Sequence, residues 1–333
     1  MTDKSRSAVF FLVALLLFAT LPLCAESQKD NVNDIGNRKV AGWSIISLQK
    51  EIAIGKQYAN QVDRQAKLIK DPVVTEYVNR LAQNLARNSD AKIPVSVKVI
   101  DNPTINAFTL PGGFIYLNSG TILAANNEGQ VAGVLAHEIG HVAERSWASE
   151  MTKRTILQYA MIPLMFTPMS IGTYYGVNAA MNGLPIAFLK FSRNQEEGAD
   201  FLGLQYMYKA GYDPNALVAF FGKVLNQERS SPGSVASIFM DHPATPDRII
   251  KDEEEIKSIL PKRSEYLLNT SEFEAVKERL QTLLTVHRRN NPNQNGPTLE
   301  RRQPQPQTVG TPPPSNPQGQ DGGDQPPILR RTD

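Results

Sequence analysis

Five residues near the middle of the chain, His137-Glu138-Ile139-Gly140-His141, constrain this sequence more than any other feature. They read H-E-x-x-H, and on a helix the two histidines lie one turn apart on the same face. That spacing lets two imidazoles reach one Zn²⁺, and Glu138 is then placed to act as general base on a water at the metal. The alternative, two partly buried helix histidines without a metal, needs a chance pairing in a chain that has only four histidines.

The residues around this motif predict a helix. Asn127 followed three residues later by Gln130 is the pattern of a capping box. Apolar residues then recur at helical spacing, at Val131, Val134, Leu135 and Val142. Gly133 and Gly140 each cost about 1 kcal/mol of helix propensity relative to alanine. Because glycine is unfavourable inside a helix, Gly133 and Gly140 predict that another chain segment passes close to the helix at these positions.

A second helix is predicted downstream. Ser192 and Gln195 again fit a capping box, and the helix is expected to run to Ala210. Gly211 would then terminate it, with Pro214 just beyond. This helix carries an acidic segment, Glu196 to Asp200.

That segment supplies the missing third protein ligand that a catalytic zinc requires. Glu196 and Asp200 are four residues apart and share a helix face. Glu196 can bind the metal, while Asp200 accepts the outer N–H of a ligand histidine and fixes its orientation. Glu197 points elsewhere on the helix. The alternative interpretation is that these three carboxylates form an ordinary solvated acidic face.

Four motifs, in order along the chain, resemble the motif pattern of one family. They are N-A-F-T-L-P-G-G at 106–113, H-E-I-G-H at 137–141, E-E-G-A-D at 196–200 and H-P…R from His242 to Arg248. The chain resembles the gluzincin family of the CAAX prenyl endopeptidases, the membrane peptidase HtpX, and periplasmic relatives such as BepA and LoiP. The resemblance implies a zincin-type domain with one Zn²⁺ per chain.

The resemblance also implies roles for individual residues. His137, His141 and Glu196 would bind the zinc, and Glu138 would be catalytic. Asn106 and Ala107 would line the cleft on a strand that binds extended substrate as an added strand. Their alternative is a plain turn after 101–103.

His242 is the least determined of the expected site residues. It precedes Pro243 in a loop before a helix that Thr245 and Pro246 are expected to begin. Three roles are open: a donor to the developing oxyanion, a fourth zinc ligand that holds the enzyme latent, or a surface histidine. We favour the donor for the active state, with latency as a resting state. Arg193 and Arg248 are interpreted as surface arginines that could orient carboxylates.

The N-terminus predicts export. Lys4 and Arg6 precede a charge-free run from Ser7 to Ala25, which is typical of a signal peptide spanning residues 1–25. We therefore expect a periplasmic protein. Cys24 offers an alternative, an outer-membrane lipoprotein, and an uncleaved membrane anchor is the third option. Cys24 is the only cysteine, so neither cleaved form holds a disulfide, which suits a bacterial envelope.

Between the ends, we expect one α+β, mostly helical domain over residues 40–289. Apolar spacing predicts a long helix from Ser47 to Ile69 and another from Pro72. Strands over 94–100, 107–110 and 113–118 would form a small antiparallel sheet beside the H-E-x-x-H helix. Residues 290–333, rich in Pro and Gln, are expected to be a disordered tail with an unknown partner.

Residues 155–189 hold no charged side chain, and prolines and glycines interrupt them too often for one spanning helix. A pair of apolar helices is expected, acting as a lid over the cleft or as core. Attachment to the membrane surface is a weaker option.

These observations predict a zinc endopeptidase of the envelope that cleaves unfolded or misfolded outer-membrane or periplasmic polypeptides. The first alternative is a zinc-binding chaperone with an occluded active site, and the second is a metal-free structural protein. Lysine plus arginine exceed aspartate plus glutamate by only two, 35 against 33, so nothing suggests a nucleic-acid partner.

Overall fold

The structure is a computed structural model that describes residues 30–165, 191–230 and 242–290. The chain divides into two units, Met1–Asn290 and Asn291–Asp333, and the second lies outside the described residues. The expected signal peptide, Cys24 and the expected disordered tail 290–333, apart from the helical Asn290, also lie outside them, so those interpretations stay predictions.

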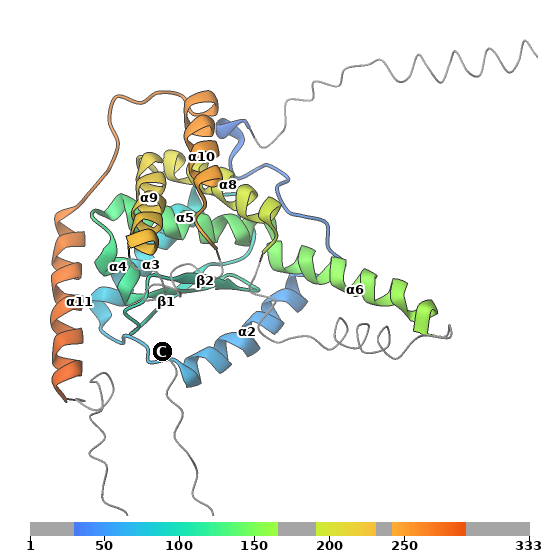
Figure 1. The fold of residues 1–333 in the computed structure, drawn as a ribbon, viewed down its shortest axis with the longest axis horizontal. Coiled ribbons are helices and arrows are strands. Elements are labelled where there is room, and N and C mark those ends of the chain that lie inside the picture. Colours follow the sequence, from blue (N-terminus) through green and yellow to red (C-terminus); the bar gives the residue numbers. More distant parts are fainter. Residues whose placement is uncertain (1–29, 166–190, 231–241, 291–333) are drawn as a thin grey trace, which may run out of the picture. The chain divides into compact units, whose positions relative to one another are not determined.

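Helices make up most of the described fold and surround one small sheet (Figure 1). The helices are η1 (Val32–Asp34), α2 (Leu48–Gln65), α3 (Pro72–Arg87), α4 (Ser119–Ala124), α5 (Glu128–Glu144), α6 (Ser146–Met165), α8 (Arg193–Ala210), α9 (Asn215–Ser230), α10 (Pro246–Ile259) and α11 (Ser271–Asn290). The strands are β1 (Ser96–Ile100), β2 (Ala107–Leu110) and β3 (Phe114–Asn118). The predicted α+β, mostly helical class is therefore confirmed.

The sheet has the order β1-β3-β2, and it is mixed rather than wholly antiparallel as predicted. β2 pairs antiparallel with β3 through a tight hairpin, whereas β1 pairs parallel with β3. The chain reverses direction after β1 and again in the hairpin, so β3 returns in the direction of β1 and inserts beside it. Gly113 in the hairpin has a φ of 82°, and a Cβ there would lie 2.2 Å from the carbonyl oxygen of Pro94.

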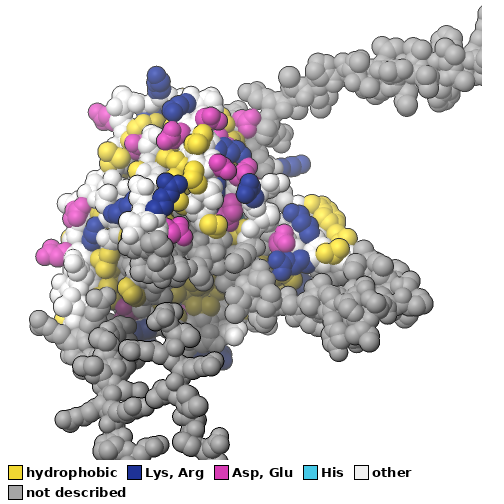
Figure 2. Space-filling model, in the orientation of Figure 1, with side chains coloured by type: hydrophobic (Ala, Val, Ile, Leu, Met, Phe, Trp, Pro, Cys, Tyr) yellow, Lys and Arg dark blue, Asp and Glu magenta, His cyan; other side chains and the backbone are white. Residues whose placement is uncertain are grey.

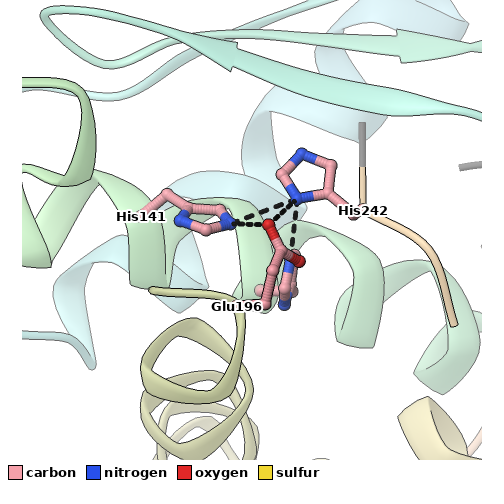
Figure 3. Close-up of side chains that lie close together, drawn as sticks. His141, Glu196 and His242 are labelled. Atoms are coloured by element: carbon pink, nitrogen blue, oxygen red, sulfur yellow. Dashed lines mark hydrogen bonds and ion pairs between the residues drawn. The ribbon is translucent and has the colours of Figure 1, made fainter. Parts of the chain in front are cut away.

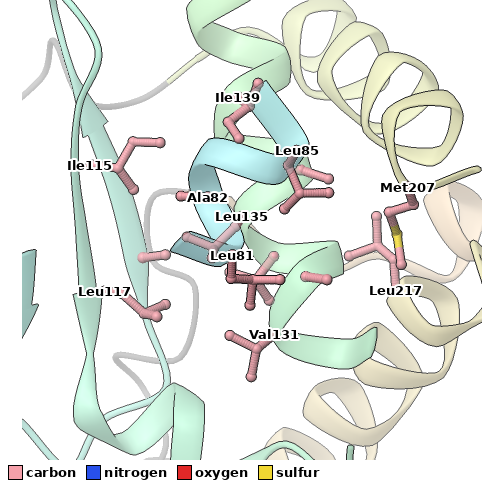
Figure 4. Packing of buried hydrophobic residues seen from close by; sticks show 14 of the residues in the cluster. Leu81, Ala82, Leu85, Ile115, Leu117, Val131, Leu135, Ile139, Met207 and Leu217 are labelled. Carbon is pink, nitrogen blue, oxygen red and sulfur yellow. The ribbon is translucent and has the colours of Figure 1, made fainter. Parts of the chain in front are cut away.

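Alternate residues of β3 face two different layers. Ile115 and Leu117 pack into the main core with α3 and α5 (Figure 4). Tyr116 points to the other face, where it packs with Ala59 of α2. The Tyr116 hydroxyl donates to Asp63 Oδ1 at 2.8 Å and anchors that helix. The sheet thus separates the α5 side, which carries the H-E-x-x-H motif, from the α2 side.

Helix starts follow the predicted caps closely. Asp71 accepts from the Val74 N–H at the start of α3, and Thr245 accepts from the Arg248 N–H at the start of α10. The helix predicted from Ser47 begins at Leu48 but ends at Gln65. The segment beyond it instead pairs with β1, because the Ile69 N–H donates to the Val99 carbonyl at 2.9 Å.

α6 continues the chain directly from the H-E-x-x-H helix, and it covers the described part of the uncharged run 155–189 as one helix. The rest of the run lies outside the described residues, so the expected second helix stays a prediction. None of the helices in the described ranges is long and apolar enough to cross a membrane. Figure 2 shows apolar side chains gathered near α6 beside Lys and Arg. The exposed ones in this region are Trp43, Ile45, Ile156, Leu157 and Tyr159.

Candidate metal centre

The two helices that carry the predicted ligands, α5 and α8, pack unusually close together. A Cβ on Gly140 would lie 2.6 Å from the carbonyl oxygen of Ala199 on α8. A Cβ on Gly203 would in turn lie 3.1 Å from the backbone nitrogen of His137. Gly133 approaches α9 in the same way, because its Cβ would lie 2.9 Å from the Cβ of Leu217. The close approaches predicted at Gly133 and Gly140 are therefore confirmed.

Both ligand helices begin at the predicted caps. Asn127 accepts from the Gln130 N–H, but the Gln130 side chain accepts from Asn126 rather than Asn127, so this box is only half formed. At α8 the Gln195 side chain accepts from the Ser192 N–H at 2.9 Å, and Gly211 ends the helix at a φ of 94°. The caps fix where each helix starts and hence which side chains face the other helix.

His137, His141, Glu196 and His242 bring four potential metal ligands together, all buried, with the ligand atoms within 4.8 Å of one another. Figure 3 shows that His242 reaches this cluster from the segment before α10, opposite the helix pair. His242 Nδ1 lies 3.3 Å from His137 Nε2 and 3.2 Å from His141 Nε2. The Glu196 carboxylate lies 3.5 Å from His137 Nε2 and 3.6 Å from His141 Nε2.

These separations fit one zinc ion. Ligand atoms about 2.0–2.1 Å from a tetrahedral Zn²⁺ stand about 3.3–3.4 Å from one another. The two distances from His242 Nδ1, 3.2 and 3.3 Å, are close to those edges, and the two Glu196 oxygens lie slightly farther from the histidines, Oε2 at 3.5 Å from His137 and Oε1 at 3.6 Å from His141. His242 Nδ1 and Glu196 Oε1, at 2.8 Å, are at hydrogen-bond distance instead. Three imidazoles and a carboxylate are also the donor types that zinc takes in proteins.

The outer nitrogens of the two helix histidines are both held. His137 Nδ1 lies 2.8 Å from Asp200 Oδ1, as expected for the predicted partner, and His141 Nδ1 lies 3.2 Å from Ser146 Oγ. These contacts turn both Nε2 atoms toward the cluster, which is how proteins orient ligand histidines. Phe191 stacks on the His141 ring at a centroid distance of 4.1 Å.

Arg248 is not the surface residue that the sequence suggested, because only 5% of it is exposed. Its guanidinium donates to both Asp200 oxygens, at 2.7 and 2.8 Å, and lies 3.2 Å from Glu196 Oε2. It also donates to the Pro243 carbonyl at 2.8 Å, which ties the His242 segment to α8. The signal for this role was its place in the H-P…R motif. Arg193 is exposed, as expected.

Charges around the cluster set its protonation. Burial alone would lower the pKa of His137, but the hydrogen bond and charge of Asp200 outweigh it and raise that pKa to about 10. Burial raises the pKa of Glu196, but the neighbouring histidines outweigh it and hold that pKa well below its usual range. The Arg248 charge likewise lowers the pKa of Asp200 against the effect of burial. Glu196 is thus kept anionic, as a metal ligand must be.

Glu138 lies fully buried next to the cluster. Its Oε2 accepts a hydrogen bond from Thr109 Oγ1 at 2.6 Å. Its Oε1 lies 3.6 Å from His242 Nε2. Within the described parts of the chain, neither Glu138 Oε1 nor His242 Nε2 has a hydrogen-bond partner. Sequence reasoning missed Thr109. The alternation of β2 could have found it, since Thr109 shares a face with Ala107.

The two residues expected on the substrate strand, Asn106 and Ala107, differ in where their backbone N–H and carbonyl groups point. The Asn106 N–H donates to Thr121 Oγ1, and its carbonyl accepts from the Asn118 N–H at 3.0 Å. Both backbone groups of Asn106 therefore point inward. Because these directions alternate along a strand, those of Ala107 and Thr109 face the side of β2 on which no described strand lies.

Comparisons with known proteins identify the family of the chain. The family described as Peptidase family M48 matches residues 72–256. The chain is 30% identical over 253 residues to the beta-barrel assembly-enhancing protease of Escherichia coli K12, covering 72% of this chain and 50% of that protein. It is 30% identical over 257 residues to the protein of the same name from Yersinia pestis, covering 72% of this chain and 51% of that protein. It is 32% identical over 176 residues to the mitochondrial metalloendopeptidase OMA1 of Saccharomyces cerevisiae, covering 51% of this chain and 48% of that protein. The chain thus spans about half the length of these curated relatives.

Proposed function

The chain belongs to peptidase family M48 and is by that membership a metallopeptidase, and from this premise we propose that it is a zinc-dependent endopeptidase of the bacterial envelope. One observation carries the proposal. His137, His141 and Glu196 converge from two tightly packed helices at distances that suit one Zn²⁺, with Glu138 buried beside them.

Zinc, when bound, would lower the pKa of a water and polarise the scissile carbonyl. Glu138 would take the proton of the attacking water and later deliver it to the leaving amine. Asp200 and Ser146 would hold the two imidazoles in place, and Arg248 would keep Asp200 ionised. These residues supply the general base and the oriented ligands that peptide hydrolysis needs.

The substrate would bind as a strand along the side of β2 on which no described strand lies. Ala107 and Thr109 direct their backbone N–H and carbonyl groups to that side, so an extended peptide can pair with them. We therefore place the substrate strand at Ala107, with Asn106 in a supporting role through its contacts to Asn118 and Thr121. Backbone pairing favours unfolded segments over folded ones, because only they can present a free strand.

His242 Nδ1 lies among the possible ligand atoms, which supports a closed arrangement of the site. Its Nδ1 completes the set of ligand atoms, so it would take the position that a catalytic zinc leaves to water or substrate. We propose that this arrangement is the latent state, and that the His242 segment must move for turnover. The role of oxyanion donor then belongs to the displaced, active arrangement.

The envelope assignment rests on the charge-free N-terminal run and on relatives named beta-barrel assembly-enhancing proteases. We propose that the chain removes misfolded outer-membrane or periplasmic proteins after export. Contact with the membrane surface would be compatible with the exposed apolar side chains near α6. The partner of the tail stays undefined.

The test compares Glu138→Gln with the wild-type protein. The variant should bind as much zinc as wild type but lose turnover of an unfolded polypeptide such as casein, by about 100-fold or more. Zinc content by mass spectrometry and release of labelled fragments measure the two effects. Equal turnover by both proteins would remove Glu138 from the reaction.

The closed position of His242 favours one second candidate, a zinc-binding chaperone that holds unfolded envelope proteins with its active site occluded. Such a protein needs the zinc ligands but not Glu138. A Glu138→Gln gene that fully rescues a deletion phenotype would support the chaperone, and a gene that fails would support the peptidase.

A further inference from the structure

Thr109 occupies a position in the structure that the proposed reaction does not yet use. It lies on β2, the strand proposed to bind substrate, and only 7% of it is exposed. Its Oγ1 donates to Glu138 Oε2 at 2.6 Å and lies 3.4 Å from the Glu138 carbonyl oxygen. A distance of 2.6 Å is in the range of a charge-assisted O–H···O⁻ bond.

This bond distinguishes the two oxygens of Glu138. Oε2 is engaged by the hydroxyl, whereas Oε1 has no hydrogen-bond partner within the described residues. Oε1 lies 3.6 Å from Nε2 of His242, the ring nitrogen that does not lie among the ligand atoms. The carboxylate is therefore held through Oε2, and Oε1 remains available to take a proton from an attacking water.

The hydroxyl also restrains a side chain that is costly to order, because a glutamate loses rotamer entropy when it is fixed in one conformation. Glu138 is fully buried, so it cannot obtain an alternative donor from bulk solvent. Removing the hydroxyl leaves a buried carboxylate oxygen without this partner, which disfavours the observed rotamer.

The backbone of Thr109 links this restraint to the substrate. Its N–H and carbonyl face the open side of β2, where the peptide is proposed to add. Its side chain faces α5 instead, as that of Ala107 does, while Phe108 between them stacks on Tyr116 on the α2 side. One residue thus contacts the substrate backbone through its main chain and Glu138 through its side chain.

We propose that Thr109 is a positioning residue that holds Glu138 by Oε2, so that Oε1 accepts the proton of the attacking water while the peptide pairs with the same strand. The proposal rests on the proposed function for its catalytic consequence. Its structural content, the bond between Thr109 and Glu138, does not depend on activity. A purely structural threonine, kept for its β-branched shape in a strand, is the competing explanation.

Thr109→Val separates the two explanations, because valine keeps the branched shape and removes only the hydroxyl. The first measurement is a double-mutant cycle of Thr109→Val and Glu138→Ala, followed by urea unfolding of the purified protein. We expect the double variant to be less destabilised than the sum of the single ones. Additive effects would overturn the proposed bond, whether or not the protein has peptidase activity.

The second measurement is turnover of a fluorogenic peptide. Thr109→Val should lower kcat about tenfold to a hundredfold, as expected for a lost hydrogen bond to a charged group, with KM within about twofold and zinc content unchanged. Thr109→Ser should recover most of kcat. The matched control is Thr152→Val, which removes a buried hydroxyl from α6 that binds Ala148 and the Ile45 N–H, away from Glu138.

The outcomes are distinct. A kcat within twofold of wild type in Thr109→Val, or a loss in Thr109→Ser as large as that in Thr109→Val, overturns the positioning role. If the wild-type protein shows no turnover that depends on Glu138, the proposed function fails instead. The unfolding cycle then still decides whether Thr109 holds Glu138.

Discussion

The α5–α8 helix pair supplies His137, His141 and Glu196, whereas His242 comes from the short segment before α10 (Figure 3). Contacts at Gly140 and Gly203 lock the helices together at distances that leave no room for a methyl group. The described part of the His242 segment is held by polar contacts as well as by packing, because Arg248 bridges the Pro243 carbonyl and Asp200 while Ala244 packs in the main core. The first region consists of two packed helices, and the second is a short segment without regular secondary structure.

This difference suggests that the helix pair and the His242 segment have different functions at the site. We therefore expect the three ligands on the packed helices to hold a metal without the fourth. The fourth position can then exchange between His242 and substrate at the cost of a few polar contacts. A closed site that can open requires such an unequal distribution of rigidity.

The largest effect is expected from Glu196→Ala, which removes a ligand from the rigid region. We expect zinc content to fall from about one per chain to near zero and the melting temperature to drop, because metal binding contributes to folding. Glu197→Ala is the matched control, since Glu197 pairs with Lys251 near the surface. Retention of zinc by a folded Glu196→Ala protein would disprove the ligand assignment.

His242→Ala tests the other region. If His242 closes the site, the variant should keep its zinc and show about tenfold or more higher basal turnover of a short peptide. A fall in turnover of about 100-fold would instead identify His242 as an oxyanion donor in the working enzyme. Unchanged kinetics would remove it from the site.

Gly140→Ala probes the packing that fixes the first region. The new Cβ would lie 2.6 Å from a backbone oxygen of α8, so the helices must separate, at a cost of about 1–3 kcal/mol of unfolding free energy. Gly222→Ala on α9 is the control, because a Cβ there meets nothing within 4 Å. That variant should be neutral or gain up to about 1 kcal/mol from helix propensity. Equal urea midpoints for the two variants would argue against tight α5–α8 packing.

A pH-dependent effect concerns Asp252, a 2% exposed carboxylate on α10 near the Arg248–Asp200 pair. Burial, and then the charge of Asp200, raise its pKa to about 9 despite Arg248. The unfolded chain releases this proton near pH 4 and the folded one near pH 9. The folded state thus binds more protons in between, and its stability falls as pH rises across that window.

Asp252→Asn should therefore be more stable than wild type at pH 8, by at least about 1.4 kcal/mol, and nearly equal to it at pH 4. Urea unfolding at both pH values measures the difference, and Glu253→Gln on the exposed side of α10 is the control. A variant that is no more stable at pH 8 than at pH 4, relative to wild type, would contradict the raised pKa.

Features that depend on neighbouring residues could be predicted from the sequence. The caps at Asp71, Ser192 and Thr245, and the strand 107–110, follow from local hydrogen bonding and alternation. The close approaches at Gly133 and Gly140 were predicted too, because a glycine inside a helix needs a packing reason.

Features that depend on distant segments could not be predicted. The parallel pairing of β1 with β3 follows from how the chain reverses twice, which no local pattern records. The burial of Arg248 and the bond from Thr109 to Glu138 arise only when α10 and β2 pack against the helix pair. The position of His242 among the ligand atoms likewise depends on the tertiary fold.

X-ray absorption at the zinc edge tests the division between the two regions most directly, because it counts imidazole ligands around the metal. For the zinc-loaded wild-type protein we predict three imidazoles and one carboxylate, and for His242→Ala two imidazoles and one carboxylate with zinc content unchanged. Two imidazoles in both proteins would show that His242 does not close the site. Loss of zinc from His242→Ala would show that the α5–α8 pair cannot hold the metal by itself.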